Sequence, residues 1–138
     1  STGYLGSHLV KVLQKEKLPF QAIARNEKKL LEQGLDYSQI IQAEVTKADT
    51  LRGKLKGAEI VISTVGITRQ KDGLTFMDVD YQANLNLLRE AQRAGIKKFI
   101  YVSVINGDKM RHLKITEAKE KFVDELKSSG MEKIWQME

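Results

Sequence analysis

Short apolar runs alternate with amphipathic segments along most of the chain. The apolar runs predict four strands, at residues 20–24, 40–43, 58–64 and 98–104. Apolar residues at helical spacing predict helices over residues 5–16, 27–33, 48–55, 76–94 and 116–129. Strands that alternate with helices through short loops are typical of an α/β protein. We expect a mostly parallel sheet with helices on both faces.

The first predicted helix follows a glycine-rich turn. Gly3 and Gly6 frame this turn, and Leu5, Leu9, Val12 and Leu13 then repeat at helical spacing. A glycine turn that leads into a helix exposes unpaired N–H groups at the positive end of the helix dipole. The turn is therefore a candidate phosphate-binding element.

Polar residues or glycines follow each predicted strand. In parallel α/β sheets, ligands bind at the carboxyl ends of the strands. We expect these ends to line one crevice with Gly3 and Gly6. They are Arg25, Glu44–Val45, the run Ser63, Thr64, Val65 and Gly66, and the run from Ser103 to Ile105.

The alternation of strands and helices is incomplete at both ends of the sequence. A turn of this type follows a strand, so we expect a first strand that lies before Ser1, outside this sequence. After the helix that Gly130 ends, a further strand should follow, but residues 131–138 have the pattern of a helical piece. We therefore expect missing residues between Gly130 and Met131.

Composition narrows the functional classes. Hydrophobic residues make up 41% of the chain and charged residues 30%, as in soluble globular proteins. No apolar run approaches a membrane span. The absence of cysteine excludes disulfides and fits a cytoplasmic protein, and two distant histidines predict no metal site. The formal net charge is +5, but the lysines are scattered, so we expect no nucleic-acid partner.

Several of these segments together resemble the extended and atypical short-chain dehydrogenase/reductases, in particular their NmrA-like branch. Thr2-Gly3-Tyr4-Leu5-Gly6 resembles the family's T-G-x-x-G element. Ser63–Gly66 resembles the segment under the adenine and ribose, and the segment from Lys97 to Ser103 resembles the fifth strand. Ala118-Lys119 resembles the lysine-bearing helix. The resemblance implies a Rossmann-type doubly wound sheet over residues 1–130 that lacks its first strand, with residues 131–138 beginning a substrate lobe that is otherwise absent.

The resemblance implies a bound dinucleotide. Its pyrophosphate would lie on the N–H groups around Tyr4 and Leu5, where a Cβ at Gly3 or Gly6 would block the approach. NAD-binding members carry Asp or Glu about twenty residues later, whereas this chain has Arg25. A guanidinium there attracts the 2′-phosphate of NADP. Glu27 is a competing acidic candidate, so NAD stays the less favoured alternative.

Catalytic residues are harder to assign. The wider superfamily uses Tyr-x-x-x-Lys, with the tyrosine as acid/base. Lys119 matches the lysine, but Ile115 occupies the tyrosine position and has no proton to donate. Lys119 could contact the nicotinamide ribose or lie on the solvent-exposed side of its helix. Ser103 could orient a substrate carbonyl or only end its strand.

These observations favour an NADP-dependent oxidoreductase that transfers a hydride to a small carbonyl or activated double bond. Ile115 favours a different class, a non-catalytic NADP sensor or assembly factor that regulates a protein partner. A nucleotide-sugar epimerase or dehydratase is a third interpretation, although it normally needs the tyrosine as well. Fold resemblance alone does not separate these functions, and it leaves the small-molecule substrate unnamed.

Overall fold

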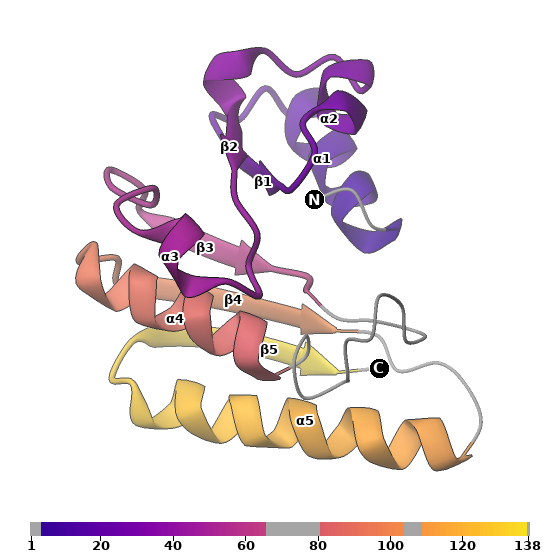
Figure 1. Ribbon diagram of the computed structural model, residues 1–138, viewed down its shortest axis with the longest axis vertical. Helices are drawn as coiled ribbons and strands as arrows, with labels where there is room; N and C mark the ends of the chain where they lie inside the picture. Colours follow the sequence, from indigo (N-terminus) through magenta and orange to yellow (C-terminus); the bar gives the residue numbers. More distant parts are fainter. Residues whose placement is uncertain (1–3, 66–80, 104–108, 138) are drawn as a thin grey trace. The chain divides into compact units, whose positions relative to one another are not determined.

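The computed structural model describes residues 4–65, 81–103 and 109–137 (Figure 1). The chain divides into two compact units, Ser1–Glu44 and Val45–Glu138. Parallel strands joined by helices make up both units, which confirms the α/β class.

The first unit holds a two-stranded parallel sheet and its helices. Strand β1 (Ala22–Ala24) pairs with β2 (Ile40–Gln42), so that Ala22 lies opposite Ile40. Helix α1 (Tyr4–Lys15) precedes β1, and α2 (Lys28–Glu32) with a 3₁₀ turn (Tyr37–Gln39) connects the strands. A small core joins these elements; it consists of Val10, Ala22, Ala24, Leu30 and Leu35, with Phe20 and Ile40 packed against it.

Helix α1 buries a different face from the one expected. Val12 is 53% exposed, whereas Val10 is buried. Gly6 is also buried. Residues 6 and 10 are four apart and share a helix face, which Val12 does not join. The prediction that Val12 lies on the buried face of α1 is therefore wrong. The face of α1 that turns inward is the one whose side chains contact the end of α2. Gln33 Nε2 donates to Ser7 Oγ (3.2 Å), and Gln14 Nε2 donates to Gln33 O (3.0 Å).

The second unit holds a three-stranded parallel sheet in the order β3-β4-β5. Its strands are β3 (Ile60–Ser63), β4 (Lys98–Ser103) and β5 (Glu132–Met137). Its helices are the short α3 (Ala48–Leu51), α4 (Asn84–Arg93) and α5 (Lys109–Ser128). Residues 81–83 form a π-helical turn that leads into α4.

Helices α4 and α5 pack on one face of this sheet (Figure 1). Phe99 and Tyr101 of β4 are fully buried there, and the Phe122 ring of α5 lies 5.8 Å and 4.9 Å from their ring centroids. On the opposite face of β3, Ile60 is 46% exposed and Ile62 is 39% exposed.

The end of the chain is a strand, so the expected helical piece at residues 131–138 is wrong. β5 pairs in parallel with β4 along its whole length, from Lys98↔Glu132 to Ser103↔Met137. Gly130 turns the chain with a positive φ of 75°, and Glu132 N donates to Lys97 O (2.8 Å). Polar residues in the strand hide the period-two pattern. The strand expected after Gly130 is present in this segment, so the reason for placing missing residues before Met131 falls away.

One further boundary differs. Helix α5 begins at Lys109, seven residues before the expected start, and therefore contains residues 112 and 115. The described strands form two sheets, because none of them joins β1 to β3. A first strand ahead of the glycine turn stays a prediction. The predicted helix over residues 76–94 is described only from residue 81 onward.

Candidate functional site

The glycine turn lies only partly within the described structure. Thr2, Gly3 and Gly66 fall outside the described residues. Tyr4, Leu5 and Gly6 form the first turn of α1, and Gly6 is buried. A helix therefore begins directly after the turn, as the sequence predicts. The first N–H groups of a helix have no partner within it and can bind an anion.

Arg25 follows β1 and presents its guanidinium to solvent. Its side chain is 64% exposed, and its Nη1 lies 3.9 Å from Glu44 Oε1. The backbone on both sides is fixed, since Gln42 Nε2 donates to Arg25 O (3.3 Å) and Lys28 N donates to Asn26 Oδ1 (2.9 Å). An exposed ion pair of this length contributes little to stability. The guanidinium can therefore turn from Glu44 to an anionic ligand at small cost.

The carboxyl end of β3 is held by a buried polar network. Ser63 is 1% exposed and Asn84 is fully buried. Ser63 Oγ donates to Asn84 Oδ1 and accepts a hydrogen bond from Val65 N (3.2 Å). Asn84 Nδ2 donates to Val65 O (3.1 Å). Both backbone groups of Val65 are thus bound by side chains, which fixes the turn that carries Thr64 and Val65.

Two more polar side chains of α4 hold earlier loops. Asn86 is 9% exposed and its Nδ2 donates to Val45 O (2.8 Å), while its Oδ1 accepts from Gln82 Nε2 (3.0 Å). Glu90 is 7% exposed, and its Oε2 accepts from Gly53 N (3.0 Å). Helix α4 therefore anchors the backbone of three loops through its own side chains.

The two candidate catalytic residues lie in the second unit. Ser103 is the last residue of β4, at the same sheet edge as the turn after β3. Lys119 lies on α5 and is 1% exposed. This burial excludes the interpretation of Lys119 as a solvent-exposed helix lysine, because lysine is almost never fully buried unless its charge is paired.

Each unit brings part of the predicted site together. In the first unit, Arg25 and Glu44 meet at the carboxyl ends of β1 and β2. In the second, Val65 and Ser103 close the neighbouring strands β3 and β4. The first group presents an exposed guanidinium, and in the second the side chains of Ser63 and Asn84 hold the backbone of the turn after β3.

The sequence prediction missed the three buried polar residues of α4. Asn84 shares the helix face of Leu87, Leu88 and Ala91, all of them buried. A polar residue in line with an apolar stripe is a readable signal, because a buried amide needs partners. Asn86 and Glu90 carried no such signal, since they do not lie in line with that apolar stripe and each also has a polar partner nearby in the sequence, Gln82 and Arg93 respectively.

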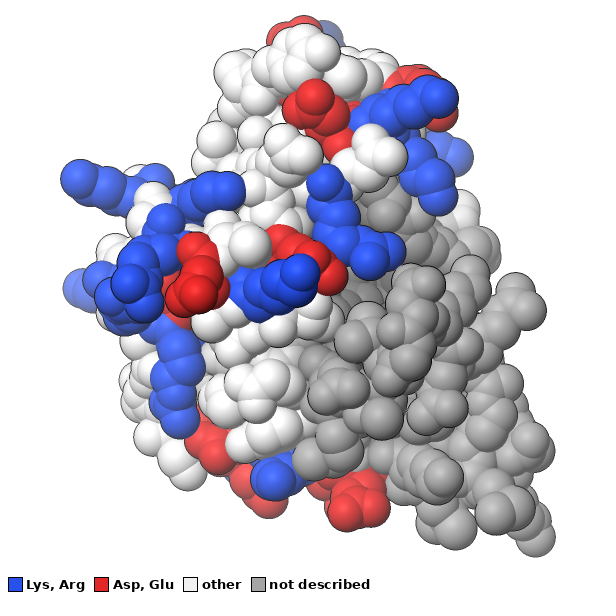
Figure 2. Space-filling view, viewed as in Figure 1, with Lys and Arg blue, Asp and Glu red and all other residues white. Residues whose placement is uncertain are grey.

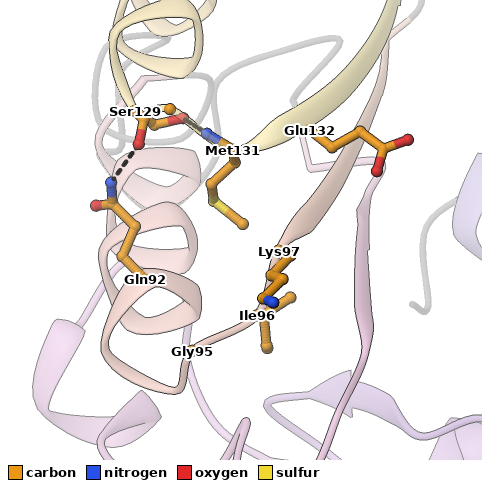
Figure 3. A pocket seen from close by; sticks show the side chains of 8 residues that line it. Gln92, Gly95, Ile96, Lys97, Ser129, Met131 and Glu132 are labelled. Carbon is orange, nitrogen blue, oxygen red and sulfur yellow. Dashed lines mark hydrogen bonds between the residues drawn. The ribbon is translucent and has the colours of Figure 1, made fainter.

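A shallow depression of about 630 Å³ lies at the opposite, amino-terminal ends of β4 and β5. Figure 3 shows Gln92 reaching Ser129 across it; Gln92 Nε2 donates to Ser129 O (3.3 Å). These contacts close the carboxyl ends of α4 and α5. We assign the depression to helix capping, because ligands of parallel α/β sheets bind at the other end of the strands.

Comparison with known proteins links this arrangement to a family. Residues 1–134 match the family model described as NAD(P)H-binding. The photosystem II assembly factor Ycf39 of Synechocystis sp. is 34% identical over 87 residues, which cover 61% of this chain and 26% of that protein. The Ycf39 protein of Guillardia theta is 27% identical over 135 residues, covering 96% of this chain and 42% of the relative. The chain thus spans less than half the length of these relatives.

Solved structures show the same fold. The NADPH-dependent quinone oxidoreductase of Escherichia coli, complexed with NADPH, superposes with a TM-score of 0.69 at 20% identity, covering 99% of this chain and 45% of that one. A nucleoside-diphosphate-sugar epimerase of Staphylococcus aureus superposes with a TM-score of 0.75 at 15% identity, covering 99% and 47%. These likenesses confirm a Rossmann-type α/β fold. No helix in the described part of the chain is long and apolar enough to cross a membrane.

Proposed function

The chain belongs to the NAD(P)H-binding family, and we propose that it binds NADP and transfers a hydride to a small carbonyl or activated double bond. The bound dinucleotide supplies the hydride. The residues of this chain bind it and orient it. We further propose that this activity is cytoplasmic, which fits a chain without cysteine.

The position of Arg25 is the observation that supports NADP over NAD as the cofactor. Its guanidinium stands at the carboxyl end of β1, its side chain is 64% exposed, and its Nη1 forms a loose ion pair with Glu44 Oε1 at 3.9 Å. A 2′-phosphate accepts paired hydrogen bonds from such a group. Glu44 disfavours a phosphate by its charge, but at this distance and exposure its effect is weaker than a direct guanidinium–phosphate contact.

The remaining roles follow from position. The first turn of α1, with Tyr4, Leu5 and Gly6, would hold the pyrophosphate together with Thr2 and Gly3. The adenosine half of the dinucleotide would lie against two turns, the one at Val45 and the one formed by Thr64, Val65 and Gly66. Lys119 would hold the nicotinamide ribose from α5, where it is buried, and Ser103 would orient the substrate oxygen.

A second candidate is a regulator that binds NADP without turnover and acts on a protein partner. Two observations favour it. Ile115 takes the place of the acid/base tyrosine, and the curated relatives from Synechocystis sp. and Guillardia theta are assembly factors. The epimerase or dehydratase alternative has less support, since it also requires the tyrosine.

Titration of the full-length protein with NADPH and NADH tests the shared premise. We expect binding of NADPH in preference to NADH, measured by the fluorescence of the reduced nicotinamide. Binding of neither dinucleotide would overturn both candidates. Steady NADPH oxidation with a panel of aldehydes, ketones and quinones supports the oxidoreductase, whereas tight binding without turnover and with a conformational change supports the regulator.

A further inference from the structure

Helix α4 contributes no residue to the site as predicted from the sequence, yet it holds two of the loops that the site uses. We propose that Asn84 is a positioning residue for the dinucleotide, and that Asn86 has the same role on the neighbouring loop. This inference rests on the proposed function, because it concerns the same site. Neither residue needs to touch the ligand.

The geometry at Asn84 is specific to an amide. Its oxygen accepts from Ser63 Oγ while its nitrogen donates to Val65 O at 3.1 Å. Ser63 Oγ in turn accepts from Val65 N at 3.2 Å. A donor and an acceptor in one buried side chain are both used, and only asparagine offers both at this length.

Packing alone does not explain an asparagine here. Its neighbours on the helix face are Leu87, Leu88 and Ala91, all buried, so an apolar residue would fit the pattern. Unlike an apolar side chain, the amide of Asn84 forms hydrogen bonds that fix the conformation of the turn after β3. The π-helical turn at residues 81–83 stands directly before Asn84, and such turns are frequent at functional sites.

A fixed turn matters for binding because ordering a loop costs free energy when the ligand arrives. With both backbone groups of Val65 held in advance, this cost is met during folding. Asn86 fixes Val45 O in the same way at 2.8 Å. Since these contacts shape backbone and do not read the 2′-phosphate, NADPH and NADH should depend on them equally.

The test compares the full-length wild type with Asn84→Asp and a matched control, Gln92→Glu. Asp keeps the acceptor for Ser63 but loses the donor to Val65 O. Gln92→Glu makes the same amide-to-acid change on α4, where the donor to Ser129 O is lost. We expect Asn84→Asp to weaken NADPH and NADH binding alike, by about tenfold, and the control to bind both as the wild type does.

Hydrogen exchange separates positioning from general destabilisation. In ligand-free Asn84→Asp the turn after β3 loses its bond at Val65 O and opens more often, although Val65 N can still donate to Ser63 Oγ. We therefore expect faster exchange at the amide of Val65, with protection in α5 unchanged. Weaker binding without a change at this amide would overturn the inference. So would unchanged binding in a folded Asn84→Asp variant, while a wild type that binds neither dinucleotide overturns the proposed function instead.

Ser63→Ala keeps the test decisive if Asn84→Asp does not fold. This variant removes the hydroxyl that accepts from Val65 N and donates to Asn84 Oδ1, but it leaves the bond from Asn84 to Val65 O. Of the two bonds lost, only the neutral one from Val65 N holds the turn, so we expect roughly threefold weaker binding of both dinucleotides. Binding equal to wild type in a folded Ser63→Ala protein would overturn the positioning role.

Discussion

Arg25 is the residue whose charge should distinguish the two dinucleotides. Arg25→Glu replaces the guanidinium with a carboxylate that repels a 2′-phosphate. The loss of a charge-assisted contact is about 1.5–3 kcal/mol, so we expect NADPH affinity to fall tenfold or more and NADH affinity to change far less. Dissociation constants from fluorescence titration measure both.

Arg52→Glu is the control for that variant. The Arg52 side chain is 67% exposed, close to the 64% of Arg25, but it belongs to the second unit and pairs with Asp49. It should leave the ratio of the two affinities unchanged. An equal loss of NADPH and NADH in Arg25→Glu would refute the assignment of Arg25 to the 2′-phosphate.

Tyr81 gives the protein a pH dependence in the alkaline range. Burial, together with the charge of Glu125 and a hydrogen bond to it, raises the pKa of Tyr81 above 10.0. Tyr81 Oη donates to Glu125 Oε1 (3.2 Å), and Lys121 Nζ lies 4.6 Å from the ring centroid. The folded protein therefore holds the Tyr81 proton to a higher pH than the unfolded chain does. The contribution of the Tyr81 hydroxyl to the free energy of unfolding is complete below pH 10.0 and is lost as the pH rises through the pKa of Tyr81 in the folded protein.

Tyr81→Phe isolates this contribution. Phenylalanine keeps the ring beneath Lys121 but loses the hydroxyl, so the free energy of unfolding should fall by about 1 kcal/mol at neutral pH. The difference from wild type should shrink above pH 10.0. Urea unfolding at several pH values measures it, and a difference that stays constant into the alkaline range would contradict the role of the hydroxyl.

The residues that sequence reasoning found and missed differ in a physical way. Arg25 follows a strand, so its place at the sheet edge could be predicted from the chain order. The Arg25–Glu44 pair and the Asn86–Val45 bond join residues 19 and 41 positions apart. Such contacts depend on how loops turn, and a periodic pattern carries no information about that.

At the scale of elements, α5 is anchored to its sheet by an aromatic cluster. Phe122 is fully buried between Phe99 and Tyr101. We expect Phe122→Ala to lower the free energy of unfolding by about 3–5 kcal/mol, since it removes a large side chain and leaves a cavity. Glu120→Ala, at an exposed position of the same helix, should change it by no more than about 0.5 kcal/mol. Chemical denaturation compares the two, and similar losses would argue against this core.

Element boundaries were predictable where glycine or a clear apolar run marks them. Gly34 and Gly130 have φ values of 92° and 75° and follow the ends of α2 and α5, as the sequence predicts. The early start of α5 and the strand β5 were not predictable in this way. Polar and apolar residues mix in both segments without a clear period, and tertiary pairing with β4 decides the conformation of β5 against its local pattern.

At the scale of the whole molecule, positive charge should speed the arrival of an anionic cofactor. The formal net charge is +5, although Figure 2 shows Lys and Arg interspersed with Asp and Glu on the face in view. We expect the NADPH association rate to fall several-fold between about 0.05 M and 0.5 M salt, as screening shortens the range of attraction. Stopped-flow fluorescence measures the rate. NADH, with fewer charges, should respond less, and a rate independent of salt would exclude electrostatic steering.

The α/β class was predictable from the alternation of strands and helices, and the structure and its likeness to solved structures confirm it. The order of the strands within each sheet was harder to predict from the sequence. The described strands split into β1-β2 and β3-β4-β5, a division that depends on long-range pairing and leaves no mark on hydrophobic periodicity.

The contacts of α4 also bear on how the protein emerges from the ribosome. Val65 is held by a residue 19 positions later, Gly53 by one 37 positions later and Val45 by one 41 positions later. Translation adds about 5–20 residues per second, so these loops spend a few seconds without the side chains that fix them. We expect the loops to become ordered together, once residue 90 has left the exit tunnel.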